Sequence, residues 1–298
     1  MDEILKLGNI SEYNSMRGVV TLHPLVSVYE LSKMKLIPPI RVHLGFYCIF
    51  LKETVCGDLK YGCNYYDYQE GTLVFIAPGQ VAGIGNPPGS PHPEGWALLF
   101  HPDLIRGTSL GRNIKEYTFF SYDTHEALHL SENERQIILD CLNKIDHELH
   151  QSIDKHSKKL ITNNIELLLN YCMRFYDRQF ITRALVNKDI LVRFENLLDN
   201  YLKSEMTKTI GLPTIKYCAD QLHISANYFG DLIKKETGKS AQEYVHLKLI
   251  DIAKERIFDR SKSISEIAYE LGFKHSQHFS RMFKNETGYT PNEYRSLN

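Results

Sequence analysis

The last third of the chain has its apolar residues at the spacing of helices. Ser263 and Glu266 form a capping box that opens one predicted helix, and Gly272 permits a sharp turn after it. A second predicted helix ends at Gly288 and has its apolar side chains three and four residues apart on one face: Phe279, Met282 and Phe283. Residues 263–288 therefore have the pattern of a helix, a tight turn and a second helix.

This pattern occurs twice. The pentapeptide "KKETG" at residues 234–238 returns as "KNETG" at residues 284–288, and the apolar positions before both also match. The second copy has one additional residue, between its turn and its second helix, where a loop can accommodate it. A repeat whose insertion falls in a turn is one supersecondary unit used twice. The first copy has His223 where the second has Gly272, so we expect its turn to be built differently.

The second helix of the second copy is predicted to leave amide, hydroxyl and guanidinium side chains outward. Arg281 can bind guanine and Gln277 can bind adenine through two hydrogen bonds each, as such side chains do in the major groove of DNA. Any solvated helix face can carry these residues, but their position after a tight turn in a duplicated unit favours DNA recognition. A continuous helix predicted over residues 240–260 would hold the copies apart, so that their second helices could enter successive major-groove segments roughly 34 Å apart.

These motifs resemble the DNA-binding domain of the AraC/XylS family of bacterial transcription regulators. The resemblance covers about residues 213–295 and rests on "CADQLHIS", "KKETGKS", "AKERI" and "SISEIAYELGFKHSQHFSRMFKNETGYTPNEYR". It implies that the second helix of each copy lies in a major groove. The residues predicted to bind DNA are Ser225, Ala226, Asn227, Asp231, Lys234, His275, Ser276, Gln277, Ser280, Arg281 and Lys284.

The first copy departs from the family's pattern at its base-contacting positions. Where the family often has larger polar or basic residues, this chain has Ala226, Asn227, Gly230 and Asp231. Asp231 could accept a hydrogen bond from cytosine, tether a neighbouring side chain, or weaken binding by repelling phosphate. Lys234 and Lys235 could still contact the DNA backbone.

Residues 18–122 are predicted to be rich in strands. Apolar and polar residues alternate along residues 41–52, and residues 71–80 have the pattern of a buried strand that runs into a Pro-Gly turn. A loop at residues 85–95 precedes the predicted strand "WALLFH". This arrangement resembles the small cupin-type β-barrel that many AraC-family members carry in front of the DNA-binding domain.

A barrel of this kind can enclose a small organic ligand. Metal-binding cupins use an HxH pair and a glutamate, whereas this chain has no HxH pair, and His43, His92 and His101 are isolated. We therefore predict no metal and no other cofactor. The candidate ligand-binding residues are Arg41, His43, Tyr47, Tyr65 and Trp96. Ordinary aromatic packing along a strand would explain the tyrosines equally well.

Two helices are predicted after the barrel, over residues 132–151 and 153–180. Each has an apolar stripe that fits either a dimer seam or packing within the chain, and both interpretations stay open. The family resemblance implies dimerisation through this region. The polar stretch over residues 177–189 predicts an interdomain linker, and a first helix of the DNA-binding domain follows at about residues 190–203.

Composition and charge agree with this division. The 298 residues suffice for two domains with their own cores. Residues 201–298 carry 15 Lys and Arg against 12 Asp and Glu, whereas the rest of the chain carries 20 against 24, which favours a polyanion as partner of the last third. The sequence has no apolar run long enough to cross a bilayer and no secretion signal, so we expect a cytoplasmic protein. Six scattered cysteines are expected to be small buried hydrophobic residues.

The sequence thus predicts an α+β chain with an N-terminal cupin-like β-barrel, flanking helices and a C-terminal all-α double helix-turn-helix domain. The expected domains are a sensor (1–130), a helical dimerisation region (131–180), a linker (181–188) and the DNA-binding domain (189–298). We predict a sequence-specific DNA-binding transcription regulator controlled by a small organic effector, with double-stranded DNA, RNA polymerase and a second copy of the chain as partners. A cupin-type enzyme with an accessory DNA module would need a metal triad or an acid–base pair, and the sequence offers neither. A regulator whose barrel serves only for dimerisation stays open.

Overall fold

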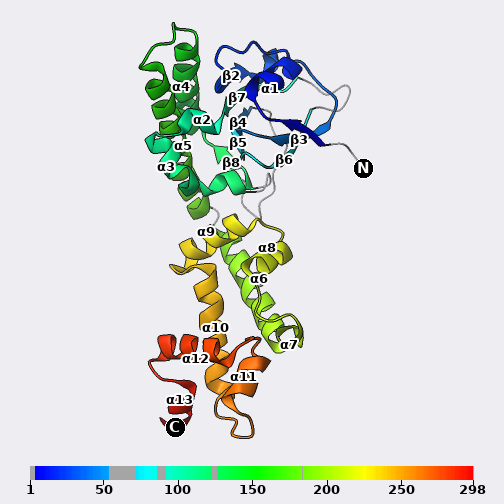
Figure 1. Ribbon diagram of the computed structural model, residues 1–298, viewed down its shortest axis with the longest axis vertical. Helices are drawn as coiled ribbons and strands as arrows, with labels where there is room; N and C mark the ends of the chain where they lie inside the picture. The colour runs from blue at the N-terminus through cyan, green and yellow to red at the C-terminus, as the bar shows by residue number, and fades with distance from the viewer. Residues whose placement is uncertain (1–3, 54–70, 86–91, 123–125, 183, 298) are drawn as a thin grey trace. The chain divides into compact units, whose positions relative to one another are not determined.

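A computed structural model describes residues 4–53, 71–85, 92–122, 126–182 and 184–297 (Figure 1). The chain divides into two compact units, Met1–Thr182 and Arg183–Asn298. The first unit combines strands and helices, and the second is helical over its described residues.

The strands of the first unit form two sheets. A three-stranded sheet has the order β1-β3-β6, in which β1 is parallel to β3 and β6 is antiparallel to it. A five-stranded antiparallel sheet has the order β2-β7-β4-β5-β8. The strands are β1 (Ile4–Leu7), β2 (Val26–Glu30), β3 (Ile40–Leu44), β4 (Tyr47–Lys52), β5 (Gly71–Ile76), β6 (Val81–Ile84), β7 (Gly95–Phe100) and β8 (Leu128–Leu130). Both sheets are open in the described part of the chain, so the predicted closed barrel is not confirmed.

The two sheets share one hydrophobic cluster. Because side chains alternate along a strand, the buried Val42 and Leu44 point into this cluster, whereas Arg41 and His43 point to the opposite face of β3. The buried side chains that the five-stranded sheet contributes are Tyr29, Cys48, Ala97 and Leu99. One core of the unit therefore lies between the sheets.

The alternating segment over residues 41–52 is two strands and not one. β3 ends at Leu44 and β4 begins at Tyr47, and the amide of Gly45 between them donates to the carbonyl of Leu7 at 2.9 Å. A Cβ on Gly45 would lie 2.7 Å from the carbonyl oxygen of Gly8, so the close approach of β1 needs a glycine at this break. The strand predicted before the Pro-Gly turn is confirmed as β5.

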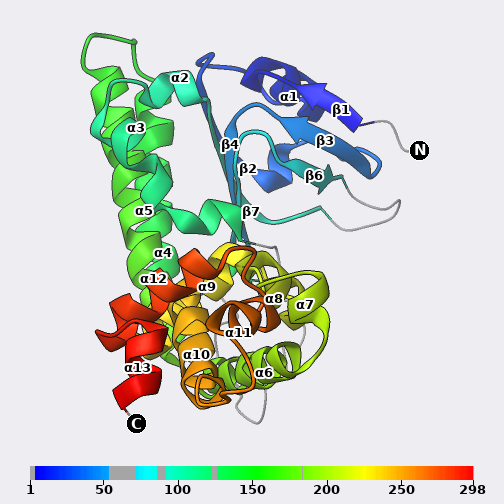
Figure 2. The ribbon, with the colours of Figure 1, turned by 60° about the horizontal axis from the view of Figure 1, so that its bottom comes forward.

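Helices cover the other face of the five-stranded sheet (Figures 1 and 2). The helical elements of this unit are α1 (Ile10–Arg17), α2 (Pro102–Ile105), α3 (Ser109–Asn113), α4 (Glu132–Leu149), α5 (Ser157–Thr182) and the 3-10 turns η1 (Leu31–Lys33), η2 (Ile114–Glu116) and η3 (Thr118–Ser121). Tyr176 of α5 stacks on Phe119 at 5.4 Å between ring centroids, and Phe119 contacts Phe75 of β5 at 4.5 Å. The apolar stripes of α4 and α5 are buried within the chain: Ile138, Leu142, Ile145, Leu149, Ile161, Ile165, Leu168 and Cys172. Of the two open interpretations, these stripes therefore serve packing within the chain.

The predicted linker over residues 181–188 is helical where it is described. α5 continues to Thr182, and α6 begins at Ala184. Polar side chains in and beside this stretch are buried and hydrogen-bonded. Gln179 holds β8 by accepting from the amide of His129 at 2.8 Å, and Asn187 donates to Glu236 at 3.3 Å. The polar composition that suggested a linker reflects these contacts.

The second unit consists of eight helices over its described residues: α6 (Ala184–Lys203), α7 (Met206–Thr209), α8 (Ile215–Leu222), α9 (Ala226–Thr237), α10 (Ala241–Arg256), α11 (Ile264–Glu270), α12 (Ser276–Thr287) and α13 (Pro291–Leu297). α10 runs between the two helix pairs, with α9 beside one end and α11 and α12 beside the other (Figure 1). Four cysteines, Cys48, Cys141, Cys172 and Cys218, are free and buried, as expected. Cys56 and Cys63 lie outside the described residues.

Candidate nucleic-acid interface

Three of the four helices in the two helix-turn-helix units, α8, α9 and α11, begin with a side-chain cap. Ser263 accepts from the amide of Glu266, whose carboxylate accepts from the amide of Ser263, so the predicted capping box opens α11. In the first copy, Thr214 caps α8 and Ser225 caps α9. Both α9 and α12 end at a glycine with a left-handed backbone. These local signals set both ends of α9 and the C-terminal end of α12.

The two turns have the same left-handed backbone, so the expectation that the first is built differently is wrong. His223 has φ 59° and Gly272 has φ 95°, at matching positions of the repeat. His223 is the only residue other than glycine with a positive φ in the described part of the chain. A Cβ on Gly272 would lie 2.9 Å from the carbonyl carbon of Gly211, so the second turn also packs tightly against the segment after α7.

Aromatic contacts hold α9 against its neighbours. Phe229 of α9 meets Phe194 of α6 edge-on at 4.9 Å between ring centroids. Tyr244 of α10 contacts the same Phe194 ring at 5.6 Å and donates a hydrogen bond to Glu195. Burial and the neighbouring carboxylate raise the pKa of Tyr244 to about 12, so its hydroxyl remains a donor at neutral pH.

The second copy is closed by α13. The Arg295 guanidinium donates to the carbonyl of Ile257 at 2.6 Å and to the carbonyl of Lys262 at 3.0 Å. Phe279 and Phe283 of α12 are fully buried in a cluster with residues of α10 and α11. The outward face of α12 is thus held in one orientation.

This outward face carries the predicted DNA-binding residues. The exposed ones are His275, Gln277, Arg281 and Lys284, and the half-buried ones are Ser276 and Ser280. His278 is also exposed and lies three residues before Arg281, hence on the same side of the helix. The prediction from sequence missed His278, although helical spacing from Arg281 was sufficient to find it.

The first copy presents a smaller and less basic face. Ala226, Asn227 and Lys234 are exposed, and Ser225 and Asp231 are half-buried. Lys235 is exposed as well, in the last turn of α9. The structure therefore places all the predicted residues of both second helices on or beside a solvent-facing side, with more cationic and amide groups along α12.

The four described candidates for ligand binding do not line one cavity. Arg41 and His43 lie on the outer face of the three-stranded sheet. Tyr47 and Trp96 lie on the helix-covered face of the five-stranded sheet, where Tyr47 stacks on Phe100 at 4.8 Å. The fifth candidate, Tyr65, lies outside the described residues. The tyrosine at position 47 thus packs as an ordinary aromatic residue.

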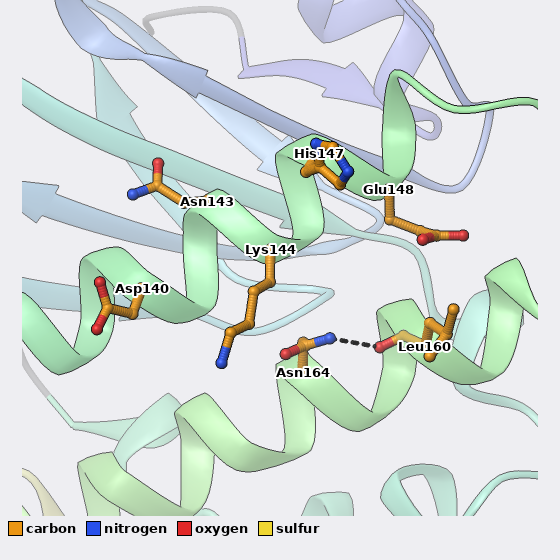
Figure 3. Close-up of a pocket in the computed structure, with 7 residues that line it drawn as sticks. All are labelled: Asp140, Asn143, Lys144, His147, Glu148, Leu160 and Asn164. Atoms are coloured by element: carbon orange, nitrogen blue, oxygen red, sulfur yellow. Dashed lines mark hydrogen bonds between the residues drawn. The ribbon is translucent and has the colours of Figure 1, made fainter.

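A groove of about 620 Å³ lies on the outer side of α4 and α5 (Figure 3). It is lined by Asp140, Asn143, Lys144, His147, Glu148, Leu160 and Asn164. Asn164 is held by a hydrogen bond to the carbonyl of Leu160 at 2.9 Å. Leu160 and Leu167 are 47% and 41% exposed on the same helix, so the outer face of α5 combines polar groups with apolar side chains.

Within the described ranges, no group of three His, Cys, Asp or Glu side chains is placed to hold a metal ion. None of the described helices is both long enough and apolar enough to span a membrane.

Comparison with known proteins connects the second unit to one domain family. Residues 218–296 match the family described as a helix-turn-helix domain. YesN of Bacillus subtilis, a transcriptional regulatory protein, is 40% identical over 85 residues, which are 28% of this chain and 23% of YesN. LumQ of Photobacterium leiognathi, a probable transcriptional regulator, is 26% identical over 180 residues, which are 60% of this chain and 62% of LumQ. The chain spans less than two thirds of the length of either relative.

A solved structure is similar over the same region. The C-terminal domain of AraT, a response regulator from Geobacillus stearothermophilus, is 26% identical with a TM-score of 0.33, covering 37% of this chain and 85% of that domain. The family match and the sequence similarity to transcriptional regulators show that the second unit carries a helix-turn-helix domain of the AraC type.

Proposed function

We propose that this chain is a sequence-specific DNA-binding transcription regulator and not an enzyme. The observation that carries the proposal is the face of α12, where Gln277, Arg281 and Lys284 are exposed on a helix fixed by two buried phenylalanines. Guanidinium and amide groups recognise base edges in the major groove, whereas lysine binds phosphate without sequence preference. A DNA-binding regulator acts where the DNA is, so we place the protein in the bacterial cytoplasm.

In this proposal the two copies contribute unequally to DNA recognition. α12 supplies most of the base contacts, because α9 has small side chains at Ala226 and Gly230 and a carboxylate at Asp231. Lys234 and Lys235 at the end of α9 contact the DNA backbone, which adds affinity and salt dependence without specificity.

Selection from a pool of random duplexes, followed by sequencing, tests this function with the full chain. The proposal expects an enriched site, with its most strongly specified base pairs in the half bound by α12. Affinity should fall steeply with salt, because a specific complex also neutralises phosphates. If no sequence is enriched while binding falls with salt, the protein binds DNA without sequence recognition, and the proposal is wrong.

The first unit has the role of effector sensing and dimerisation in this proposal, and RNA polymerase is the expected partner at the promoter. The buried stripes of α4 and α5 are used within the chain, so a second copy would bind their outer face, where Leu160 and Leu167 are exposed. L160R combined with L167R should convert a dimer into a monomer in analytical ultracentrifugation, and the exposed L5R should leave the dimer intact as the control. A wild-type monomer, or a dimer that survives the double change, would contradict this assignment.

The effector is proposed to be organic, so a chelator should leave operator binding unchanged. Loss of DNA binding on addition of a chelator, restored by a transition metal, would favour a metal-dependent sensor instead.

A further inference from the structure

The first unit holds an arginine inside its core. Arg17 is the last residue of α1 and only 3% exposed, beside the hydrophobic cluster between the two sheets. Its Nε and Nη1 atoms are buried without a hydrogen-bond partner among the described residues. The guanidinium carbon lies 5.7 Å from the centroid of the Tyr13 ring, a contact that satisfies none of these N–H donors.

Two further polar atoms are buried without a well-formed hydrogen bond in the part of the chain that the structure describes, the Asn14 Oδ1 and the Tyr29 hydroxyl. The Tyr13 side chain lies beside both Tyr29 and Arg17 and interacts with each of them. Asn14 is fixed in place, because its Nδ2 donates to the hydroxyls of Ser27 and Thr21 at 3.1 Å each. Burial raises the pKa of Tyr29 well above its usual value, against the opposing charge of Arg17, so the hydroxyl remains protonated.

An arginine in this position needs an anion. A buried guanidinium charge without a partner is strongly unfavourable. The described carboxylates nearest along the chain are engaged elsewhere. Glu12 accepts from the amide of Gly8 at 3.2 Å, and Glu30 pairs with Lys33 at 2.8 Å.

We propose that Arg17, Tyr29 and Asn14 form the polar end of a binding site for a small organic carboxylate. The guanidinium binds both carboxylate oxygens, the Tyr29 hydroxyl donates to one of them, and the Asn14 Oδ1 accepts from a hydroxyl or amino group near the carboxylate. The apolar body of the ligand packs among side chains of the surrounding cluster, such as Leu31 and Phe46. This inference deepens the proposed sensing role of the first unit and rests on it.

The stability of the unliganded full chain is the first test. R17M keeps the length and packing of the side chain but removes the buried charge. If Arg17 serves a ligand, R17M should melt at a temperature equal to or higher than the wild type, because removal of the buried charge outweighs the lost contact with Tyr13. A large fall in melting temperature would show that Arg17 stabilises the fold itself, which would overturn the proposal.

Ligand binding is the second test, by thermal shift with sodium hexanoate, benzoate, 3-hydroxybutyrate and mandelate at equal ionic strength. Sodium chloride and sodium phosphate serve as controls for inorganic anions. At least one organic carboxylate should raise the melting temperature of the wild type and of R112Q, the control for an exposed arginine, but not of R17M. Y29F should weaken binding of that ligand by about tenfold or more, because the carboxylate loses one charge-assisted hydrogen bond.

Each remaining outcome decides against the proposal. An equal effect of phosphate or chloride would reduce the site to general anion binding, and an unchanged shift in R17M would place the ligand elsewhere. No shift with any carboxylate would exclude this ligand class. DNA selection with R17M separates the two proposals, because it should enrich the same sequence as the wild type even if the carboxylate site does not exist.

Discussion

Gly272→Ala should destabilise the second unit by about 2–4 kcal/mol. The residue has φ 95°, a backbone that costs an L-amino acid roughly 1–2 kcal/mol. The new Cβ would lie 2.9 Å from the Gly211 carbonyl carbon and 3.1 Å from the Leu212 amide nitrogen. Such a forced backbone contact adds about 1–3 kcal/mol, and the smaller entropy of the unfolded alanine chain returns about 0.4–1 kcal/mol.

Gly230→Ala is the matched control within the same repeat. A Cβ on Gly230 meets nothing within 4 Å, and the residue lies inside α9. Because glycine disfavours a helix interior relative to alanine, this change should stabilise the unit by about 0.5–1 kcal/mol. Both substitutions replace glycine with alanine. Opposite signs of their effects on the free energy of unfolding would therefore isolate the contribution of the turn geometry.

Urea unfolding of the full chain with two optical signals measures the effect on each unit. Trp96 of β7 is the only tryptophan of the chain, so its fluorescence reports the first unit, whereas circular dichroism reports the helices of both. With a slope of about 1–3 kcal/mol per molar urea, G272A should lower the midpoint of the helical transition by about 1–2 M. An unmoved helical midpoint, or an equal loss in G230A, would refute the assigned turn geometry.

Three further changes test neighbouring features. H223G should raise the free energy of unfolding of the second unit by up to about 1 kcal/mol, because glycine relieves the left-handed strain at this turn. A lower urea midpoint would show that the imidazole stabilises the unit by more than the strain costs. R295Q should lower the free energy of unfolding of the second unit by about 1–3 kcal/mol, because two backbone carbonyls lose a charged donor. An unchanged urea midpoint would contradict the stabilising role of α13. D231R should tighten non-specific DNA binding and steepen its salt dependence in fluorescence anisotropy; a loss confined to one base pair of the site would mean that Asp231 makes a specific contact.

The helix-turn-helix repeat could be predicted because its signals are local. The capping box at Ser263, the glycine ends of both second helices and the spacing of Phe279 and Phe283 each act within a few residues. The backbone of His223 could not be predicted in this way, because histidine seldom adopts positive φ. The match to Gly272 in the repeat carried the signal, but the change from glycine to histidine led to the wrong prediction of a different turn.

The first unit was less accessible to prediction, because its contacts join distant parts of the chain. Alternation showed that Arg41 and Val42 face opposite ways, but not that the cluster between the sheets lies on the side of Val42. The polar side chain of Gln179 contributed to the prediction of a linker, although it forms hydrogen bonds with the backbone at β8. The burial of Arg17 could not be predicted from local signals, because it depends on the packing of α1 against strands distant in the chain.

The central claim is that α12 recognises bases through Arg281 while Lys284 contacts phosphate. The most direct test compares R281A and K284A by selection and sequencing from random duplexes. R281A should cost about 1–3 kcal/mol at the preferred site and relax selection at one base pair, because a bidentate contact to guanine is lost. K284A should weaken binding evenly across sequences and reduce the salt dependence while keeping the enriched site. An enriched site that is identical in R281A and the wild type would contradict the account.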